Sequence, residues 1–271
     1  MKIFCITIFN KNYRLFKKIN LIPVGLGEEK FSKNWLTDKN DNSIYEKNNF
    51  YGEYTFHYSL WKNNIIKKNC KSWIGFCTYR RFWIKKFTNK IDNINQLKKN
   101  ALKRIPKEWN NYDSILVQPI FMQKLKKIKI LKNGLCEILK NPKIFFKKKL
   151  NIQDQFNLFH GSKYLKIAID LLDKKEKPYF IKFLRKDNFN PYNMFFCKKY
   201  KILEKYYESV FPWLSRIEEE IGFKNLDNYG TKRIYGFLAE RYCSYWFNRH
   251  TKSMSWPIAF LDTNQFLKIN S

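Results

Sequence analysis

The run from Trp73 to Trp83 constrains the fold more than any other part of the chain. Residues 73–79 are mostly apolar, aromatic or β-branched, which is typical of a strand buried on both faces. The run ends in Arg80 and Arg81, two of only nine arginines among 53 basic residues. Arginine binds phosphate through two parallel hydrogen bonds and stacks on aromatic rings, whereas lysine acts as a point charge. Because open α/β sheets bind ligands at the carboxyl ends of their strands, the pair predicts an anion site there. A solvated strand end is the alternative, since arginine is mostly exposed.

Segments typical of strands and of helices alternate along the chain. Tyr51, Tyr54, Tyr58 and Trp61, for example, recur at the three- and four-residue spacing of a helix. The alternation predicts an α/β fold with a mostly parallel central sheet flanked by helices. No repeat or linker interrupts it, so residues 1–271 are expected to form a single domain. Strands are predicted at 1–9, 73–79, 112–119 and 192–197, helices at 47–67, 91–102, 152–174 (interrupted at 160–162), 201–221 and 233–247, and loop with short elements at 10–41.

The chain is strongly basic. It has 53 Lys and Arg against 23 Asp and Glu, a formal net charge of +30. Such a charge by itself indicates a nucleic-acid partner. However, Lys, Asn and Ile are abundant together, as in AT-rich coding sequences, and the lysines are spread along the whole chain. We attribute the charge to this bias and expect no nucleic-acid partner. Nucleic-acid binding, with its steep salt dependence, is the alternative.

The cysteines and the apolar segments indicate a cytoplasmic location. The six cysteines form no C-x-x-C pair, and Cys5, Cys77 and Cys197 lie in predicted buried strands, as free thiols in a reducing compartment do. No segment approaches the length of about 18 apolar residues needed to span a membrane. The amino-terminal apolar run is too short for a signal peptide.

A series of motifs occurs in order along the chain: Lys47–Thr55 with Trp61–Asn63, Thr78–Arg81, Tyr112–Leu116, Phe159–Ser162, Tyr192–Phe195 and Arg233–Arg241. Together they resemble a bacterial family of presumed glycosyltransferases from capsule and O-antigen gene clusters, long catalogued as a domain of unknown function. The chain departs from the family at Thr78, where His is usual, and by one residue inserted between Asp41 and Lys47.

The resemblance implies a GT-A-like nucleotide-diphospho-sugar transferase fold. It also implies transfer of a sugar from a nucleotide-diphosphate donor, a UDP-sugar by analogy, to a growing surface polysaccharide or lipid-linked glycan. An inactive glycosyltransferase-like scaffold is a further alternative. The residues themselves indicate only an α/β domain with an anion-binding strand end.

Many nucleotide-sugar transferases hold a divalent metal with an Asp-x-Asp pair, and this chain has none. Asp38 and Asp41 come nearest, but their three-residue spacing indicates a capping or surface pattern. Arg80 and Arg81 lie where the metal-binding pair would be expected. Two guanidinium groups supply about the charge of one divalent cation. We therefore predict metal-independent transfer without a cofactor, with Arg80 and Arg81 holding the leaving group.

Glu240 is the candidate general base or sugar-hydroxyl ligand, because it follows Gly236 in a stretch rich in aromatic residues. A structural ion pair with Arg241 or Arg233 is the alternative. The other candidates are Thr7, Asn48, Glu53, Tyr79, Asp113 and Asn193 for the donor, and His160, Arg233 and Arg241 for the acceptor.

Residues 121–150 carry ten lysines against one acidic residue, Glu137, with Ile and Leu interleaved. This pattern predicts an insertion with at least one basic amphipathic helix that lies on an anionic membrane surface. A solvated basic face inherited from the compositional bias is the alternative.

Liposome co-sedimentation tests the membrane role. Binding should require anionic lipid and fall as salt rises, because each Lys near such a surface contributes about 1 kcal/mol. Neutral liposomes are the control. If replacing five of these lysines with Gln leaves binding intact, the insertion does not dock the protein.

Overall fold

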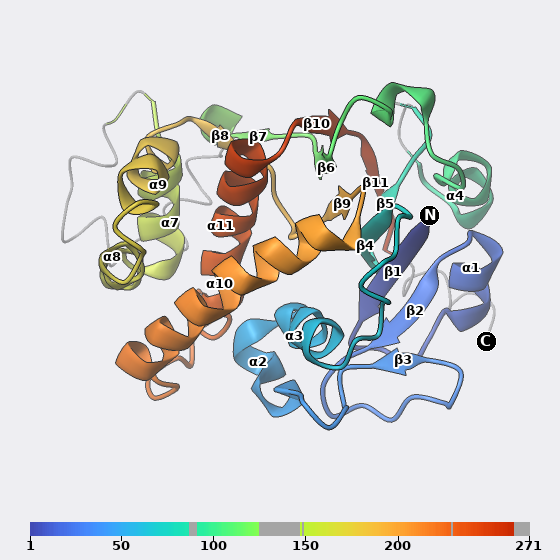
Figure 1. Ribbon diagram of the computed structural model, residues 1–271, viewed down its shortest axis with the longest axis horizontal. Helices are drawn as coiled ribbons and strands as arrows, with labels where there is room; N and C mark the ends of the chain where they lie inside the picture. The colour runs from blue at the N-terminus through green and yellow to red at the C-terminus, as the bar shows by residue number, and fades with distance from the viewer. Residues whose placement is uncertain (87–90, 125–146, 148, 229, 263–271) are drawn as a thin grey trace.

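The computed structural model describes residues 1–86, 91–124, 147, 149–228 and 230–262 (Figure 1). Most of the predicted insertion at 121–150 lies outside these residues, and the single domain over 1–271 stays a prediction. None of the helices in the described part of the chain combines the length and the apolar character of a membrane span.

In the described part of the chain, the central sheet has nine strands. Their main order is β10-β6-β9-β4-β1-β2-β3, and β5 joins β4 to β11. The pairs β1–β2, β1–β4, β2–β3 and β6–β10 are parallel, whereas β9 runs antiparallel to both neighbours. The strands of this sheet are β1 Lys2–Thr7, β2 Ile22–Gly25, β3 Leu36–Thr37, β4 Ile74–Thr78, β5 Arg81–Trp83, β6 Ser114–Val117, β9 Phe195–Cys197, β10 Ser253–Trp256 and β11 Ile258–Phe260; β7 Ile120–Phe121 and β8 Asn188–Phe189 form a separate pair.

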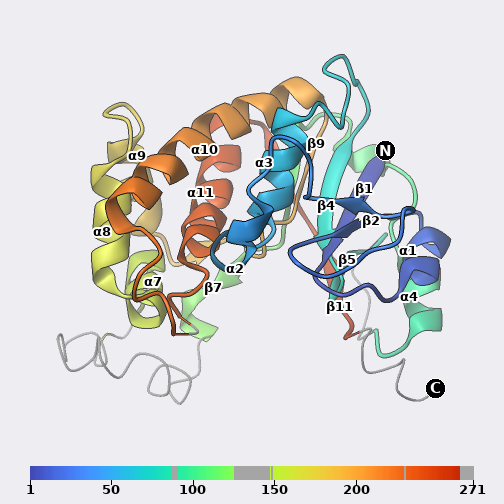
Figure 2. The same ribbon diagram turned by 90° about the horizontal axis from the view of Figure 1, so that it is seen from below.

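Helices cover both faces of the sheet, as Figure 2 shows. One face carries α1 and α4, and the other carries α2, α3, α10 and α11, with α7 to α9 packed beyond α11. The α-helices are α1 Tyr13–Lys18, α2 Asn48–Tyr51, α3 Tyr54–Lys62, α4 Ile94–Asn100, α7 Ile152–His160, α8 Ser162–Asp170, α9 Lys177–Leu184, α10 Tyr200–Ile221 and α11 Ile234–His250; the 3-10 turns are η1 Tyr45–Lys47, η2 Lys107–Trp109 and η3 Met122–Lys124.

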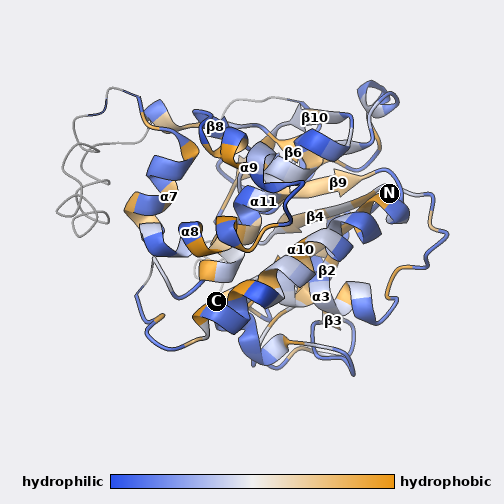
Figure 3. Cartoon of the chain, turned by 60° about the vertical axis from the view of Figure 1, so that its left-hand side comes forward, coloured by the Kyte–Doolittle hydropathy of each residue, from blue (hydrophilic) through white to orange (hydrophobic). Residues whose placement is uncertain are grey.

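The strands separate two apolar cores. In β1, Ile3 and Cys5 pack into the core beneath α1 and α4, whereas Phe4 and Ile6 pack into the core beneath α3, α10 and α11. Successive strand residues point to opposite faces, so a sheet covered on both sides needs apolar residues at nearly every position. Strands β4 and β9 accordingly have mainly apolar colours in Figure 3, while the polar and apolar residues alternate along α10. This explains the continuous apolar run from which the strand at 73–79 is predicted.

The structure confirms the α/β class and the mostly parallel sheet, and it corrects several boundaries. The segment at 10–41, predicted as loop with short elements, contains the short elements α1, β2 and β3, and Pro23 and Gly25 lie within β2. The helix predicted at 47–67 breaks at Gly52, whose φ is 60°, and ends at Lys62. The interruption predicted at 160–162 occurs at Gly161, whose φ is 91°, and the second helix ends at Asp170. Left-handed glycines end helices because they adopt this backbone without a Cβ clash.

The strand directions bring several polar segments to one edge. β1 ends at Thr7 and β4 at Thr78, and these parallel strands are paired. Because β9 is antiparallel to β4, the residues that precede β9, including Asn193, lie at the same edge. The carboxyl edge of the sheet is therefore where several of the predicted motifs meet.

Candidate anion-binding site at the carboxyl edge of the sheet

The arginine pair lies at a tight turn at the end of β4. Thr78 ends this strand, Arg81 begins β5, and the two residues pair across the antiparallel strands. Tyr79 and Arg80 form the turn, which is held to β1 because the Tyr79 N–H donates to the carbonyl of Ile6 at 3.2 Å. The pair thus stands just beyond the end of a parallel strand, as the sequence predicts.

The two arginines have different partners. The Nε of Arg80 lies 3.6 Å from a carboxylate oxygen of Asp262. The guanidinium carbon of Arg81 lies 3.9 Å from the centre of the Tyr192 ring and 5.6 Å from that of Phe260. Carboxylates of the described residues pair with Arg80 but not with Arg81.

A third arginine reaches the same region from the start of α11. Nη2 of Arg233 lies 3.3 Å from a carboxylate oxygen of Glu53, and the Arg233 side chain is 49% exposed. Arg233 passes so close to Gly52 that a Cβ on Gly52 would lie 2.3 Å from Nη2. The φ of 60° at Gly52 requires glycine at the turn between α2 and α3, and the missing Cβ also leaves room for Arg233.

The pKa of the Tyr79 hydroxyl responds to Arg80, Arg81 and Arg233 together. Burial, the largest effect, raises the pKa of its hydroxyl, and the charge of Asp262 adds to that rise. The positive charges of Arg80, Arg233 and Arg81 oppose it. The phenol is thus within electrostatic reach of all three guanidinium groups. We call Arg80, Arg81 and Arg233 the arginine group.

The loop before β9 has an uncommon backbone. Tyr192 and Asn193 have φ values of 75° and 51°, in the left-handed region. The Asn193 amide is almost fully buried and engaged within the protein: it donates to Glu53 (2.8 Å) and to the carbonyl of Gly236 (3.4 Å) and accepts from the Tyr54 hydroxyl (3.2 Å). Asn193 thereby fixes the Glu53 carboxylate beside Arg233.

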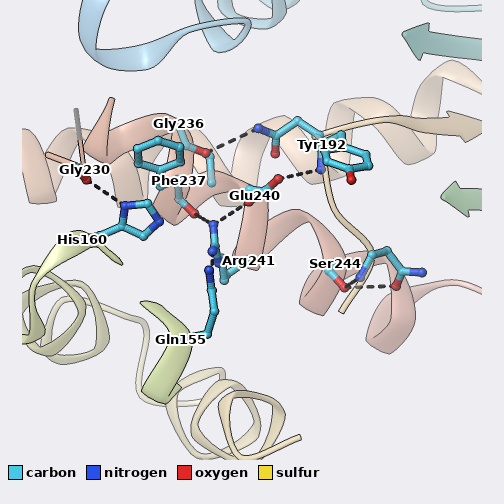
Figure 4. A network of polar contacts seen from close by, with 12 residues as sticks. Gln155, His160, Tyr192, Gly230, Gly236, Phe237, Glu240, Arg241 and Ser244 are labelled. Carbon is cyan, nitrogen blue, oxygen red and sulfur yellow. Dashed lines mark hydrogen bonds and ion pairs between the residues drawn. The ribbon is translucent and has the colours of Figure 1, made fainter. Parts of the chain in front are cut away.

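Glu240 holds the same loop from α11 (Figure 4). One of its carboxylate oxygens accepts the Tyr192 N–H at 2.6 Å, and the other pairs with Arg241. Arg241 is 2% exposed and also donates to the side chain of Gln155 (2.7 Å) and to the carbonyl of Phe237 (3.2 Å). Of the two roles that the sequence leaves open for Glu240, the ion pair with Arg241 is present in the structure.

Thr7 and Asn48 shape the edge of the sheet next to the arginine group. The hydroxyl of Thr7 accepts the N–H of Phe9 at 3.0 Å and so turns the chain as it leaves β1. Asn48 donates to the carbonyl of Gly52 (2.9 Å) and to the hydroxyl of Thr55 (3.2 Å), which ties α2 to α3.

His160 and Asp113 lie away from the arginine group. His160 stacks on Phe237 at 4.0 Å and bonds the carbonyl of Gly230 at 2.7 Å; burial lowers its pKa to about 3, with the charge of Arg241 adding to the effect. Asp113 precedes β6, at the amino edge of the sheet, where it accepts the N–H of Lys252 (3.1 Å). A residue that begins a strand lies at the edge opposite to the one where parallel strands end.

In the described part of the chain, no three His, Cys, Asp or Glu side chains are placed to hold a metal ion. Metal independence therefore stays a prediction from the missing Asp-x-Asp.

Comparison with known families gives a match over most of the chain. The model of a domain of unknown function, DUF4422, matches residues 4–252. The chain belongs to the DUF4422 family. This agrees with the resemblance to a family catalogued as a domain of unknown function.

The fold of this DUF4422 chain also occurs in a solved structure. The apo structure of WbbM, described as a bifunctional glycosyltransferase, is similar with a TM-score of 0.66 and 19% identity, over 97% of this chain and 45% of that chain. The DUF4422 chain thus spans less than half the length of that protein. At this identity the similarity shows the shared fold. A comparison with curated proteins gives no match.

The position of one acidic residue, Asp38, differs from the one predicted from the sequence. Asp38, interpreted with Asp41 as a capping or surface pattern, is fully buried next to the end of β3, while Asp41 is exposed. The Asp38 carboxylate accepts the N–H of Gly27 (3.2 Å) and the hydroxyl of Thr55 (2.5 Å). Burial raises the pKa of Asp38 to about 6, against the effect of these hydrogen bonds. Tyr192 is the other residue that the sequence analysis does not select, although it begins the motif Tyr192–Phe195. The local pattern gives neither the burial of Asp38 nor the contact of Tyr192 with Arg81.

The Asp38 carboxyl should make stability depend on pH. Its raised pKa means that the folded protein holds a proton that the unfolded chain releases between pH 3.8 and about 6. The proton on Asp38 contributes fully to the free energy of unfolding below this interval. This contribution is lost as pH rises through about 6. Asp38→Asn keeps an acceptor for Gly27 and does not titrate. We expect the free energy of unfolding in urea to fall with pH, relative to Asp38→Asn, across this interval; parallel curves would contradict the assignment.

Proposed function

We propose that the protein is a metal-independent glycosyltransferase that moves a sugar from a nucleotide-diphosphate donor, a UDP-sugar by preference, to a growing surface polysaccharide or lipid-linked glycan. The observation that carries the proposal is the arginine group at the carboxyl edge of a mostly parallel sheet. It is supported by the fold shared with a protein described as a bifunctional glycosyltransferase. The proposed location is the cytoplasm, at the inner face of the cell membrane.

The arginine group fits the chemistry of a departing nucleoside diphosphate. When the bond between the sugar and the diphosphate breaks, negative charge grows on the leaving oxygen. Guanidinium groups held by the fold stabilise this charge without reorganisation, and they bind phosphate oxygens in pairs. Arg80 and Arg233 are each about half exposed, and each is paired with a carboxylate at more than 3 Å. Ion pairs of this kind contribute little, so a diphosphate competes well for both arginines.

The neighbouring candidates take supporting places in the proposal. Tyr79 and Thr7 form the turns beside the arginine group, and Asn48 shapes the α2–α3 turn that Arg233 crosses. Glu53 is the carboxylate at the border of the group, where a donor sugar hydroxyl can bind. Acceptor binding by the buried His160 and Arg241, and donor binding by Asp113 at the opposite edge, stay predictions.

Changing both Arg80 and Arg81 to Ala should leave the protein folded and abolish transfer. Loss of one such donor to developing negative charge costs about 100- to 1,000-fold in rate, and two should cost more. A screen of nucleotide sugars by thermal shift identifies the donor, and release of the nucleoside diphosphate then measures turnover. The control is Arg249→Ala, which removes an arginine from the last turn of α11, at the end opposite to Arg233.

Full turnover in the folded double variant would contradict the role of the arginine pair. Binding of DNA or RNA with steep salt dependence and no response to nucleotide sugars would support the nucleic-acid alternative instead.

Turnover should survive excess EDTA, because the sequence contains no Asp-x-Asp to hold a cation that bridges the diphosphate. Release of the nucleoside diphosphate with EDTA, and with added Mn²⁺, measures this. Loss of turnover in EDTA that Mn²⁺ restores would contradict metal independence and leave the glycosyltransferase assignment in place.

A further inference from the structure

Arg81 differs from the other two members of the arginine group. Among the described residues, carboxylates pair with Arg80 and Arg233, and the guanidinium carbon of Arg80 also lies 4.9 Å from the centre of the Tyr79 ring. Arg81 contacts two aromatic rings and pairs with no carboxylate of these residues. The Tyr192 ring, at 3.9 Å from the guanidinium carbon, is the nearer of the two. An aromatic face fixes a guanidinium through its plane and leaves the N–H groups around the edge available. Arg81 is thus held in place without using the donors that bind phosphate.

Tyr192 is held where the backbone alone would not place it. Left-handed φ is strained at a bulky residue and persists only where the surroundings impose it. Here the surroundings are identified: Glu240 accepts the Tyr192 N–H at 2.6 Å, and Asn193, also left-handed, is anchored through its buried amide. Strain of this kind concentrates at functional sites.

Glu240 is itself fixed from the core. Both carboxylate oxygens are engaged, one by the Tyr192 N–H and one by Arg241, whose side chain is 3% exposed. A buried guanidinium needs its counter-ion, so Glu240 cannot leave Arg241 without a large penalty. A chain of contacts therefore runs from Arg241 through Glu240 and Tyr192 to Arg81.

We propose that Tyr192 is a positioning residue for the donor diphosphate: its ring presents Arg81 to the phosphate oxygens, and Glu240 holds the Tyr192 turn instead of accepting the acceptor's proton. The inference rests on the proposed function, and it assigns to Glu240 the second of the two roles that the sequence leaves open. It also adds to the donor site Tyr192, the first residue of the motif Tyr192–Phe195, from which the sequence analysis selects only Asn193.

Titration of the full chain with UDP tests the role of Tyr192. Tyr192→Leu removes the aromatic face and should weaken UDP binding about twofold to tenfold, the range of an Arg–aromatic contact. Tyr192→Phe keeps the face and should restore the affinity. The matched control is Tyr179→Leu, which removes the ring that stacks on Arg249 at 3.4 Å, away from the site. Thermal melting verifies that each variant is folded.

The outcomes separate the two proposals. If folded Tyr192→Leu binds UDP as tightly as the wild type, or if Tyr179→Leu weakens binding equally, the positioning role is wrong and the glycosyltransferase proposal stands. If the wild type binds neither UDP nor inorganic pyrophosphate, the proposed function fails, and the positioning role fails with it.

Glu240→Gln tests the second half of the inference. It exchanges one of the two acceptor oxygens for a donor, so it should loosen the Tyr192 turn and raise the Kd for UDP. Combined with Tyr192→Leu, its effect on UDP affinity should not add, because both changes act on the same contact. A large fall in kcat with unchanged UDP affinity is the result expected of a proton acceptor, and it would overturn this assignment.

Discussion

The buried guanidinium of Arg241 is the constraint on which the candidate site depends. Arginine stays charged in any protein, and an unpaired charge in the core is strongly destabilising, so the fold must supply partners. It does so with the carboxylate of Glu240, the side chain of Gln155 and the carbonyl of Phe237. Because the pair locks Glu240, it also locks the loop whose N–H Glu240 accepts. The buried charge of Arg241 thus fixes the Tyr192 loop at the edge of the sheet.

The sheet brings the loop to its place. β9 lies between β4 and β6 and runs against both, so the chain enters β9 at the edge where β4 ends. A parallel β9 would have carried Tyr192 and Asn193 to the opposite edge, far from the arginine group. The same edge receives α11, whose first residues follow Arg233. Three segments that are distant in sequence therefore meet at one edge of the sheet.

Charge alone does not distinguish this edge, because lysines are spread over a chain with a formal net charge of +30. What distinguishes it is the kind of cation and how each is held. Arg80 and Arg233 have part-exposed carboxylate partners that an anion can replace, and Arg81 is held by aromatic faces. A diphosphate needs several fixed donors, and rigid planar guanidinium groups supply them better than mobile ammonium groups.

The sequence by itself determined the features that depend on neighbouring residues. The apolar strands, the aromatic spacing of α3 and the arginines just past β4 follow from local pattern, and all three are found in the structure. Tertiary structure decided the rest. Asp38 is buried while Asp41 is not, Glu240 meets Tyr192, and Asp113 lies at the far edge. These outcomes depend on strand order and direction and on which helix covers which face, and such choices are made by burial over the whole chain, which no short pattern records.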